Sequence, residues 1–295
     1  MRAVDRRSFD VTQSSLTFGR AVGKEDFLLN KARLMLQLLS TKPFEFWDRA
    51  FMAVERRLET SQRDRNLASI DSLSTPPHAL QVYLDRFLAE DALKQTEAHI
   101  TEALERLAHS APFNMALSAD FRLARFCYAA CRAIKPQTVV ETGVAYGVTT
   151  CMILKALETN GIGELWSIDV PPLTADSQDY QGILVSSSLR ARWHLCCGTS
   201  RRILPGLLKQ LPDGVDVFVH DSLHTYRNMA REFETIWPVL KSMLISDDID
   251  RNDAFLDFVT AAQPAISFAV REDLKDSVFG VALKNDNLVD AQVCG

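Results

Sequence analysis

The stretch "VVETGVAYGVTT" at residues 139–150 decides the expected fold. Two β-branched residues lead into Glu141, and glycines follow at 143 and 147, which is typical of a buried strand that turns sharply into a helix. In open α/β sheets, ligands bind beyond the carboxyl ends of the strands, where the strand order reverses. A helix that begins near Tyr146 would aim its N-terminus at the same place. The stretch therefore predicts a ligand site at the end of the first strand.

A regular alternation of short apolar runs with helical patterns begins at about residue 119. Strands that alternate with helices form a parallel sheet with right-handed crossovers. Only about seven residues separate the last two runs, too few for a helical crossover, so these two strands should pair antiparallel. We therefore predict an α/β fold with a Rossmann-like doubly wound sheet. Its expected strands are 138–142, 164–169, 193–197, 215–220, 243–247, 266–270 and 278–283.

The first third of the chain has helical apolar spacing and no recognisable catalytic motif. Residues 1–24 are expected to be poorly structured, and residues 25–118 to form an all-helical N-terminal region. Within that region Pro43 suits the start of a second helix, and a long helical pattern runs from about 79 to 108. We expect the region to cover the substrate or to join subunits into a homo-oligomer. Residues 119–295 would form the ligand-binding domain.

The overall composition argues against several classes of partner. The formal charge is −5, which gives no electrostatic reason to expect nucleic acid. No apolar run approaches the length of about 18 residues that crosses a bilayer, and the start lacks a continuous apolar secretory signal. The six cysteines match no zinc-binding spacing. We therefore expect a cytoplasmic protein that binds neither nucleic acid nor membranes.

Acids at the ends of the first two strands indicate the kind of ligand. A dinucleotide fingerprint would have a third glycine in the turn after the first strand, and this turn has only two. Glu141 is expected to point its charge into the site, where it would repel phosphate and suit a cation. Asp169 ends the second strand, where an acid commonly accepts hydrogen bonds from ribose hydroxyls. A ribose, a positive centre and no phosphate describe S-adenosylmethionine.

Five segments in this order carry a resemblance to a known family: "VVETGVAYGVTT", "WSIDVPP", "CCGTSRRILPGLL", "DVFVHDSLHTYRNMAREFETIWPVLKSMLISDDID" and "SVFGVALK". Over about residues 119 to 285 the chain resembles the class I S-adenosylmethionine-dependent methyltransferases. More narrowly, it resembles the metal-dependent macrocin-type O-methyltransferases and, more distantly, catechol O-methyltransferase. The resemblance implies a seven-stranded sheet whose last strand is antiparallel.

The resemblance also implies which residues bind the cofactor. Thr199 and Ser200 match the position after the third strand that usually meets the adenine, although an acid is common where Thr199 stands. Tyr146 and Thr149 belong to the turn and helix start that contain the two glycines. The predicted cofactor-binding residues are Glu141, Gly143, Tyr146, Gly147, Thr149, Asp169, Thr199 and Ser200.

Three aspartates follow two of the expected strands and suggest a metal site. Asp221 comes after the fourth strand, and Asp247 and Asp248 come at the end of the fifth. With no lysine or arginine adjacent, these carboxylates would repel one another unless a cation intervened, and oxygen ligands suit Mg²⁺ or Mn²⁺. Adjacent strand residues face opposite sides, so Asp247 and Asp248 can share an ion only where the strand has ended. Alternatively, Asp248 or Asp250 caps the helix expected around 253–262.

His224 lies three residues after Asp221, where the next helix begins. A histidine there could take the proton of a substrate hydroxyl, because its ordinary pKa is near neutrality. The resemblance places a base at this position and the acidic trio at the positions given above. The alternative is a surface residue in the first turn of the helix. His220 should point the other way in its strand and is assigned a structural role.

These observations predict a magnesium-dependent O-methyltransferase with His224 and Asp221 as catalytic residues. Its acceptor would be the hydroxyl of a small molecule such as a sugar or a natural product. One alternative is an NAD-type oxidoreductase on a Rossmann sheet, against which the missing third glycine and the late antiparallel strand count. Another alternative is a non-catalytic assembly protein that binds an adenosine ligand.

Overall fold

The computed structural model describes residues 24–59, 70, 73, 75–108, 120–170, 173, 178–272 and 277–286, with only the backbone of residues 24–31. The prediction for residues 1–24 therefore lies, except for Lys24, outside the described residues. Among the described helices, none combines the length and the apolar character needed to cross a bilayer.

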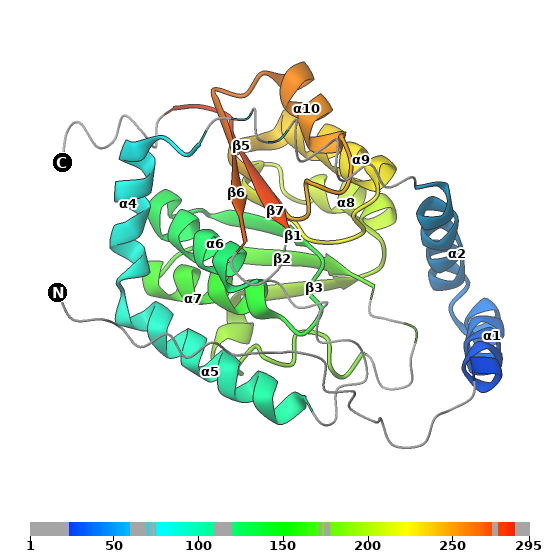
Figure 1. Ribbon diagram of the computed structural model, residues 1–295. Coiled ribbons are helices and arrows are strands. Elements are labelled where there is room, and N and C mark those ends of the chain that lie inside the picture. The colour runs from blue at the N-terminus through cyan, green and yellow to red at the C-terminus, as the bar shows by residue number, and fades with distance from the viewer. Residues whose placement is uncertain are drawn as a thin grey trace.

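Seven strands within the described residues form one sheet in the order β3-β2-β1-β4-β5-β7-β6 (Figure 1). Strands β1 to β5 run parallel, and β7 is antiparallel to both of its neighbours, so the predicted fold is confirmed. The strand β5 ends at Ser246, one residue earlier than expected. The strands are β1 (Thr138–Thr142), β2 (Glu164–Asp169), β3 (Trp193–Cys197), β4 (Val215–His220), β5 (Leu240–Ser246), β6 (Ile266–Arg271) and β7 (Val278–Leu283).

Helices cover both faces of this sheet (Figure 1). The side chains of α6 and α7 pack with Val139 and Val217, and those of α8, α9 and α10 pack with Val140 and Phe218. Successive strand residues point to opposite sides, so burial of both faces explains why the strands read as continuous apolar runs. The helical segments are α6 (Phe121–Ile134), α7 (Val148–Asn160), α8 (Ser200–Leu208), α9 (Tyr226–Ile236), α10 (Ala254–Ala262) and the 3₁₀ turns η2 (Leu189–Arg192) and η3 (Trp237–Val239).

The N-terminal helices divide between two places on the molecule (Figure 1). Helix α4 packs on α6, and α5 packs on α7, so both extend one helical layer of the sheet domain. Helices α1 and α2 contact each other and lie on the other side of the molecule, beside the carboxyl ends of the parallel strands. These helices are α1 (Lys24–Thr41), α2 (Pro43–Leu58), α4 (His78–Leu88) and α5 (Asp91–Leu107).

The expectation of a single helix at 79–108 is wrong, because the helical conformation is interrupted between α4 and α5 at Glu90. The carboxylate of Glu90 accepts hydrogen bonds from the Tyr128 hydroxyl and from Nε and Nη2 of Arg132, the latter two at 2.8 Å. Both partners lie on α6. A charge-assisted bidentate contact is strong enough to hold the residue in the extended conformation that starts a new helix.

The order of the strands reverses between β1 and β4, and Gly143 follows β1 at this point. Its φ is +88°, and a Cβ atom there would lie 1.9 Å from the carbonyl oxygen of Asp221. The turn after β1 and the segment after β4 are therefore in backbone contact. Only glycine can adopt this left-handed conformation easily and also fit without a Cβ atom in the space that remains.

Replacing Gly143 by alanine should destabilise the protein far more than the same change at Gly161. Gly161 also has a positive φ, +73°, but a Cβ atom there would meet nothing within 4 Å. Gly161→Ala should therefore cost about 1–2 kcal/mol of unfolding free energy for the left-handed conformation alone. Gly143→Ala should cost about 4 kcal/mol or more because backbone must also move. Urea unfolding of both variants measures this, and equal losses would contradict the steric role of Gly143.

Candidate active site

A cleft of about 1580 Å³ opens at the carboxyl edge of the sheet. Its walls come from the ends of β1, β2, β3, β4 and β5 and from helix α2. Parallel strands bring their carboxyl ends to one edge, and this edge at a reversal of strand order is where such sheets bind ligands. Of the predicted site residues, Gly143, Asp169, Thr199, Ser200, Asp221, His224, Asp247 and Asp248 line the cleft.

Asp169 stands in the cleft at the end of β2. Its Oδ2 accepts a hydrogen bond from Nε2 of Gln181 at 2.8 Å. Burial raises the pKa of Asp169, while hydrogen bonds from Gln181 and from the backbone N–H groups of Val170, Ala145 and Val144 partly oppose the rise. The carboxyl group therefore lies against the turn that follows β1, in the place predicted for ribose recognition.

Glu141 lies behind the cleft, fully buried. Its Oε2 accepts hydrogen bonds from the hydroxyls of Thr150 at 2.9 Å and Ser167 at 2.7 Å. Burial raises the pKa of Glu141 to about 8, although these two hydrogen bonds oppose the rise. The carboxyl group faces Thr150 and Ser167 and does not line the cleft, so the expectation that it points into the site is wrong. Its part in cofactor binding stays a prediction.

Three other predicted residues also lie outside the lining of the cleft. Tyr146 is buried, and its carbonyl oxygen accepts a hydrogen bond from the backbone N–H of Leu184 at 3.1 Å. Gly147 has a φ of +95°, and a Cβ atom there would lie 3.0 Å from Cα of Gly182. Thr149 is buried, with no hydrogen-bond partner for its hydroxyl. These residues shape the turn, and direct cofactor contacts from them stay predictions.

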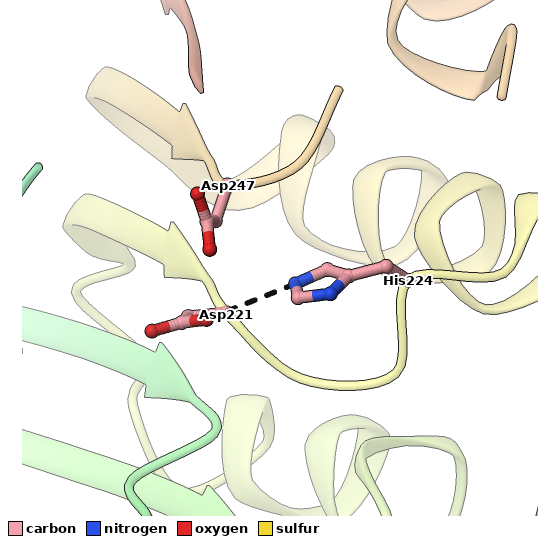
Figure 2. A group of neighbouring side chains, drawn as sticks. All are labelled: Asp221, His224 and Asp247. Atoms are coloured by element: carbon pink, nitrogen blue, oxygen red, sulfur yellow. Dashed lines mark ion pairs between the residues drawn. The ribbon is translucent and has the colours of Figure 1, made fainter. Parts of the chain in front are cut away.

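Asp221, His224 and Asp247 bring their side chains together in the cleft (Figure 2). One carboxylate oxygen of each aspartate and one imidazole nitrogen all lie within 4.8 Å of one another. The two aspartates follow β4 and β5, and His224 comes from the loop that leads into α9. Two carboxylates and an imidazole at this separation can hold a divalent cation.

Asp248 is turned toward His224 and Arg251. Its φ is +50°, so the extended chain has ended before this residue, as sharing an ion with Asp247 would require. Its Oδ2 lies 3.0 Å from Nδ1 of His224 and 2.7 Å from Nε of Arg251. The expectation that no arginine adjoins the acidic trio is therefore wrong. Asp248 as a metal ligand stays a prediction.

Neither Asp248 nor Asp250 caps helix α10. The N-cap residue is Asp253, and the amide of Ala254 donates to Oδ1 of Asn252 at 3.0 Å. Asp250 instead accepts a hydrogen bond from the backbone N–H of Val278 at 3.1 Å. The capping alternative for the two acids is wrong.

The contact with Asp248 orients the imidazole of His224. Burial lowers the pKa of His224, and the hydrogen bond to Asp248 partly opposes the decrease. Burial alone would raise the pKa of Asp248, but His224 and Arg251 outweigh it and hold the pKa below its ordinary value. An ionised Asp248 accepts the Nδ1 proton, which leaves a lone pair on Nε2. This Nε2 has no hydrogen-bond partner and lies 3.7 Å from Oδ1 of Asp221.

Residues 140–249 match a family model described as a methyltransferase domain. This part of the chain is similar to methyltransferase domains. The match confirms the resemblance to the class I S-adenosylmethionine-dependent methyltransferases and covers the turn after β1, the end of β2 and the cluster around His224. It also counts against the NAD-type oxidoreductase. No curated protein matches the sequence significantly.

Solved structures similar to this chain have low sequence identity to it. An O-methyltransferase from Bacillus cereus in complex with SAH is 13% identical, with 69% of this chain and 95% of that chain covered at a TM-score of 0.46. The O-methyltransferase TomG from Streptomyces achromogenes, involved in tomaymycin synthesis and bound to SAM, is also 13% identical. The match covers 76% of this chain and 99% of that chain at a TM-score of 0.47. SAH-bound PaMTH1 from Podospora anserina is 14% identical, with 75% of this chain and 95% of that chain covered at a TM-score of 0.43. The fold rests on the observed strand order and not on these likenesses.

A buried network beneath the cleft is absent from the sequence-based prediction. Glu232 on α9 accepts hydrogen bonds at Oε2 from Thr142 and His220, both at 2.7 Å, and at Oε1 from Ser222 and Asn228, both at 2.9 Å. It joins the ends of β1 and β4 to α9. The His220 ring packs edge-on against His224, with 5.2 Å between centroids. The network thus supports the imidazole in the cleft from below.

One signal could have revealed this network. Asn228 and Glu232 are four residues apart on the buried side of α9, beside Met229 and Phe233. Two polar side chains within a buried helical face need hydrogen-bond partners in the sheet. His220, the polar residue that ends β4, is the natural partner.

Glu232→Gln should destabilise the protein at neutral pH. The difference in unfolding free energy between the wild type and this variant should become smaller in acid. Burial alone raises the pKa of Glu232, but the charge of His220 and hydrogen bonds from His220, Ser200 and Thr142 outweigh it and lower the pKa to about 2. A lowered pKa gives stability that is present above the ordinary pKa of a glutamate and is lost as the pH falls toward 2. We expect a loss of about 3 kcal/mol at pH 7.

Urea unfolding of the wild type and of Glu232→Gln at pH 7, 5 and 4 measures this difference. The matched control is Glu234→Gln, two residues further along the same helix and exposed to solvent. This control should change stability by less than about 0.5 kcal/mol. A difference for Glu232→Gln that does not depend on pH would show that Glu232 is not ionised in the folded protein.

Proposed function

We propose that this protein transfers the methyl group of S-adenosylmethionine to a hydroxyl oxygen of a small molecule, with a divalent cation beside that hydroxyl. One observation carries the proposal: the carboxylates of Asp221 and Asp247 converge with the imidazole of His224 in the cleft, within the residues that match a methyltransferase domain. Transfer to a hydroxyl requires that the oxygen lose a proton, and these groups suit that task.

Asp169 supports the cofactor side of the proposal. A carboxylate at the end of β2 accepts hydrogen bonds from ribose hydroxyls, and Asp169 lines the cleft beside the turn after β1. The backbone of Gly143 forms the floor of the cleft between Asp169 and Asp221. A ribose at Asp169 would leave the sulfonium end of the cofactor near the Asp221–His224 cluster. S-adenosylmethionine supplies the methyl group to be transferred.

The donor set of the cluster fits a hard divalent cation. Asp221 and Asp247 would hold it through carboxylate oxygens, which Mg²⁺ and Mn²⁺ prefer. Such a cation supplies Lewis acidity that makes a neighbouring hydroxyl more acidic. The positive charge of Arg251 offsets the negative charge of Asp248. Asp221 and Asp247 are therefore the stronger candidates for metal ligands.

His224 is the base in this proposal. Asp248 accepts its Nδ1 proton and fixes the ring, so that Nε2 faces the cleft with a lone pair. This nitrogen can take the proton of the acceptor hydroxyl, and the imidazolium that forms is stabilised by Asp248. A lone pair bound to a metal cannot take a proton, so the proposal assigns His224 to proton transfer and not to metal binding.

Helix α2 supports a small molecule as the acceptor. Phe44, Trp47 and Phe51 of α2 line the cleft and are 74%, 56% and 47% exposed. An acceptor with an apolar part, such as a glycoside or another natural product, would cover these rings. The pairing of subunits through the N-terminal helices is a further part of the proposal, and it would use the apolar side chains of Val54 and Leu58.

His224→Ala should lower kcat by about 10²–10⁴-fold, the usual range for general base catalysis. In the wild type, kcat should rise with pH as the imidazole loses its proton, with a midpoint below the ordinary histidine pKa because burial lowers that pKa. The variant should lack this rise. Transfer of labelled methyl groups from S-adenosylmethionine to a panel of phenols and glycosides identifies an acceptor on which kcat is measured.

His99→Ala is the matched control for this experiment, because His99 is exposed on α5 and lies outside the cleft. It should leave kcat and its pH dependence unchanged. Affinity for S-adenosylhomocysteine and metal content should remain normal in His224→Ala. Loss of bound metal in that variant would instead make His224 a ligand.

Removal of divalent cations with a chelator should abolish methyl transfer, and Mg²⁺ or Mn²⁺ should restore it. Asp221→Ala should mimic the chelator, because it removes one of the two carboxylates that converge on the cation. The affinity for S-adenosylhomocysteine, measured by calorimetry, should change little in both cases. Full turnover in excess chelator would contradict the cation while leaving methyl transfer itself in place.

A further inference from the structure

Asp48 connects helix α2 to the rim of the cleft. It is only 7% exposed, although it belongs to a helix outside the sheet domain. Its Oδ1 accepts a hydrogen bond from the Thr199 hydroxyl at 2.9 Å, and its Oδ2 accepts one from Nε of Arg202 at 2.8 Å. Thr199 and Arg202 belong to the start of α8, directly after β3. A buried carboxylate from α2 therefore lies at the end of β3.

Two more acids of α2 fix the helix in this position. Glu55 forms an ion pair with Arg231 of α9 at 2.5 Å. Glu59, the C-cap residue of α2, accepts a hydrogen bond from the backbone N–H of Tyr226 at 2.9 Å. The partners lie on α9, and the Tyr226 amide belongs to its first turn, where a negative charge is favourable. The position of α2 is thus set by contacts with α9 as well as by those of Asp48 with the start of α8.

The position of Asp48 relative to Asp169 shows which part of the cofactor it would meet. The backbone N–H of Gly198, after β3, donates to the carbonyl oxygen of Asp169 at 2.9 Å, so the two strand ends adjoin. The reacting methyl group must lie on the other side, toward β4, where Asp221 and His224 stand. A ribose at Asp169 therefore directs its base toward β3. Asp48 and Thr199 line the cleft there.

We propose that Asp48 accepts a hydrogen bond from the exocyclic amino group of the cofactor's adenine, so that helix α2 completes the cofactor site. This inference rests on the proposed use of S-adenosylmethionine. Oδ1 of Asp48 accepts one hydrogen bond, from Thr199, and a carboxylate oxygen has a second lone pair for another donor. The contact is charge-assisted and partly buried, which makes it selective for a base that carries an amino group.

The test is a thermodynamic cycle with two ligands and the full-length protein. The ligands are S-adenosylhomocysteine and its analogue in which the purine carries hydrogen in place of the amino group, and calorimetry gives both affinities. The wild type should bind S-adenosylhomocysteine about 10- to 100-fold more tightly than the analogue, the usual effect of a charge-assisted hydrogen bond. Asp48→Ala should reduce this ratio to about threefold or less, because the acceptor is lost.

Glu55→Ala is the matched control, since it removes another anchor of α2 without touching the base. It should weaken both ligands equally and keep the wild-type ratio. Asp48→Asn keeps the shape of the side chain and a neutral acceptor oxygen. It should give an intermediate ratio of the two ligand affinities. It replaces Asp48→Ala in the test if the alanine variant does not fold.

Two results would overturn the inference while leaving the proposed function in place: a wild type that binds both ligands equally, or an Asp48 variant that keeps the full ratio. A wild type that binds neither ligand would overturn both. A ratio that falls as far in Glu55→Ala as in Asp48→Ala would also overturn the inference, because the effect would then come from the docking of α2 and not from the Asp48 carboxylate.

Discussion

The contact between the Gly143 backbone and the carbonyl of Asp221 is the constraint on which the site depends. It joins the turn after β1 to the segment after β4 at the reversal of strand order. Backbone hydrogen bonds connect the neighbouring strand ends along this edge. The amide of Asp221 donates to the carbonyl oxygen of Thr142, and the amide of Asp247 donates to the carbonyl oxygen of His220, both at 2.8 Å. The distance between the two aspartates is therefore set by main-chain geometry, and their side chains converge without any adjustment of loops.

Charge at this edge is distributed unevenly among residues that look alike in sequence. Asp247 and Asp248 are neighbours, yet Asp248 is matched by Arg251 and tied to His224, while Asp247 faces Asp221. Glu141 and Glu232 are both buried, but the pKa of Glu141 is raised to about 8 while that of Glu232 is lowered to about 2. The difference follows from their partners: two hydroxyls do not compensate the cost of burying a charge, whereas an imidazole with three further donors does.

The sheet could be predicted because its strands are buried on both faces and read as continuous apolar runs between turns. Asp169, Asp221 and Asp247 could be predicted because each follows such a run. What the sequence could not show depends on residues far apart in the chain. Glu90, at the break between α4 and α5, is bound by Tyr128 and Arg132, and Asp48 is bound by Thr199, which is 151 positions away. The orientation of Glu141 is set by Ser167 on the neighbouring strand.

The attachment of helix α2 has a consequence for how such an enzyme can change over time. Its contacts with the sheet domain include ion pairs and hydrogen bonds at the rim, and Phe44, Trp47 and Phe51 remain exposed in the cleft. Substitutions at Phe44, Trp47 or Phe51 can therefore alter which molecules fit the cleft while the sheet and its acids stay intact. In the proposed function the acceptor would contact α2 while the reacting groups belong to the strand ends, so acceptor range could vary without loss of the reaction chemistry.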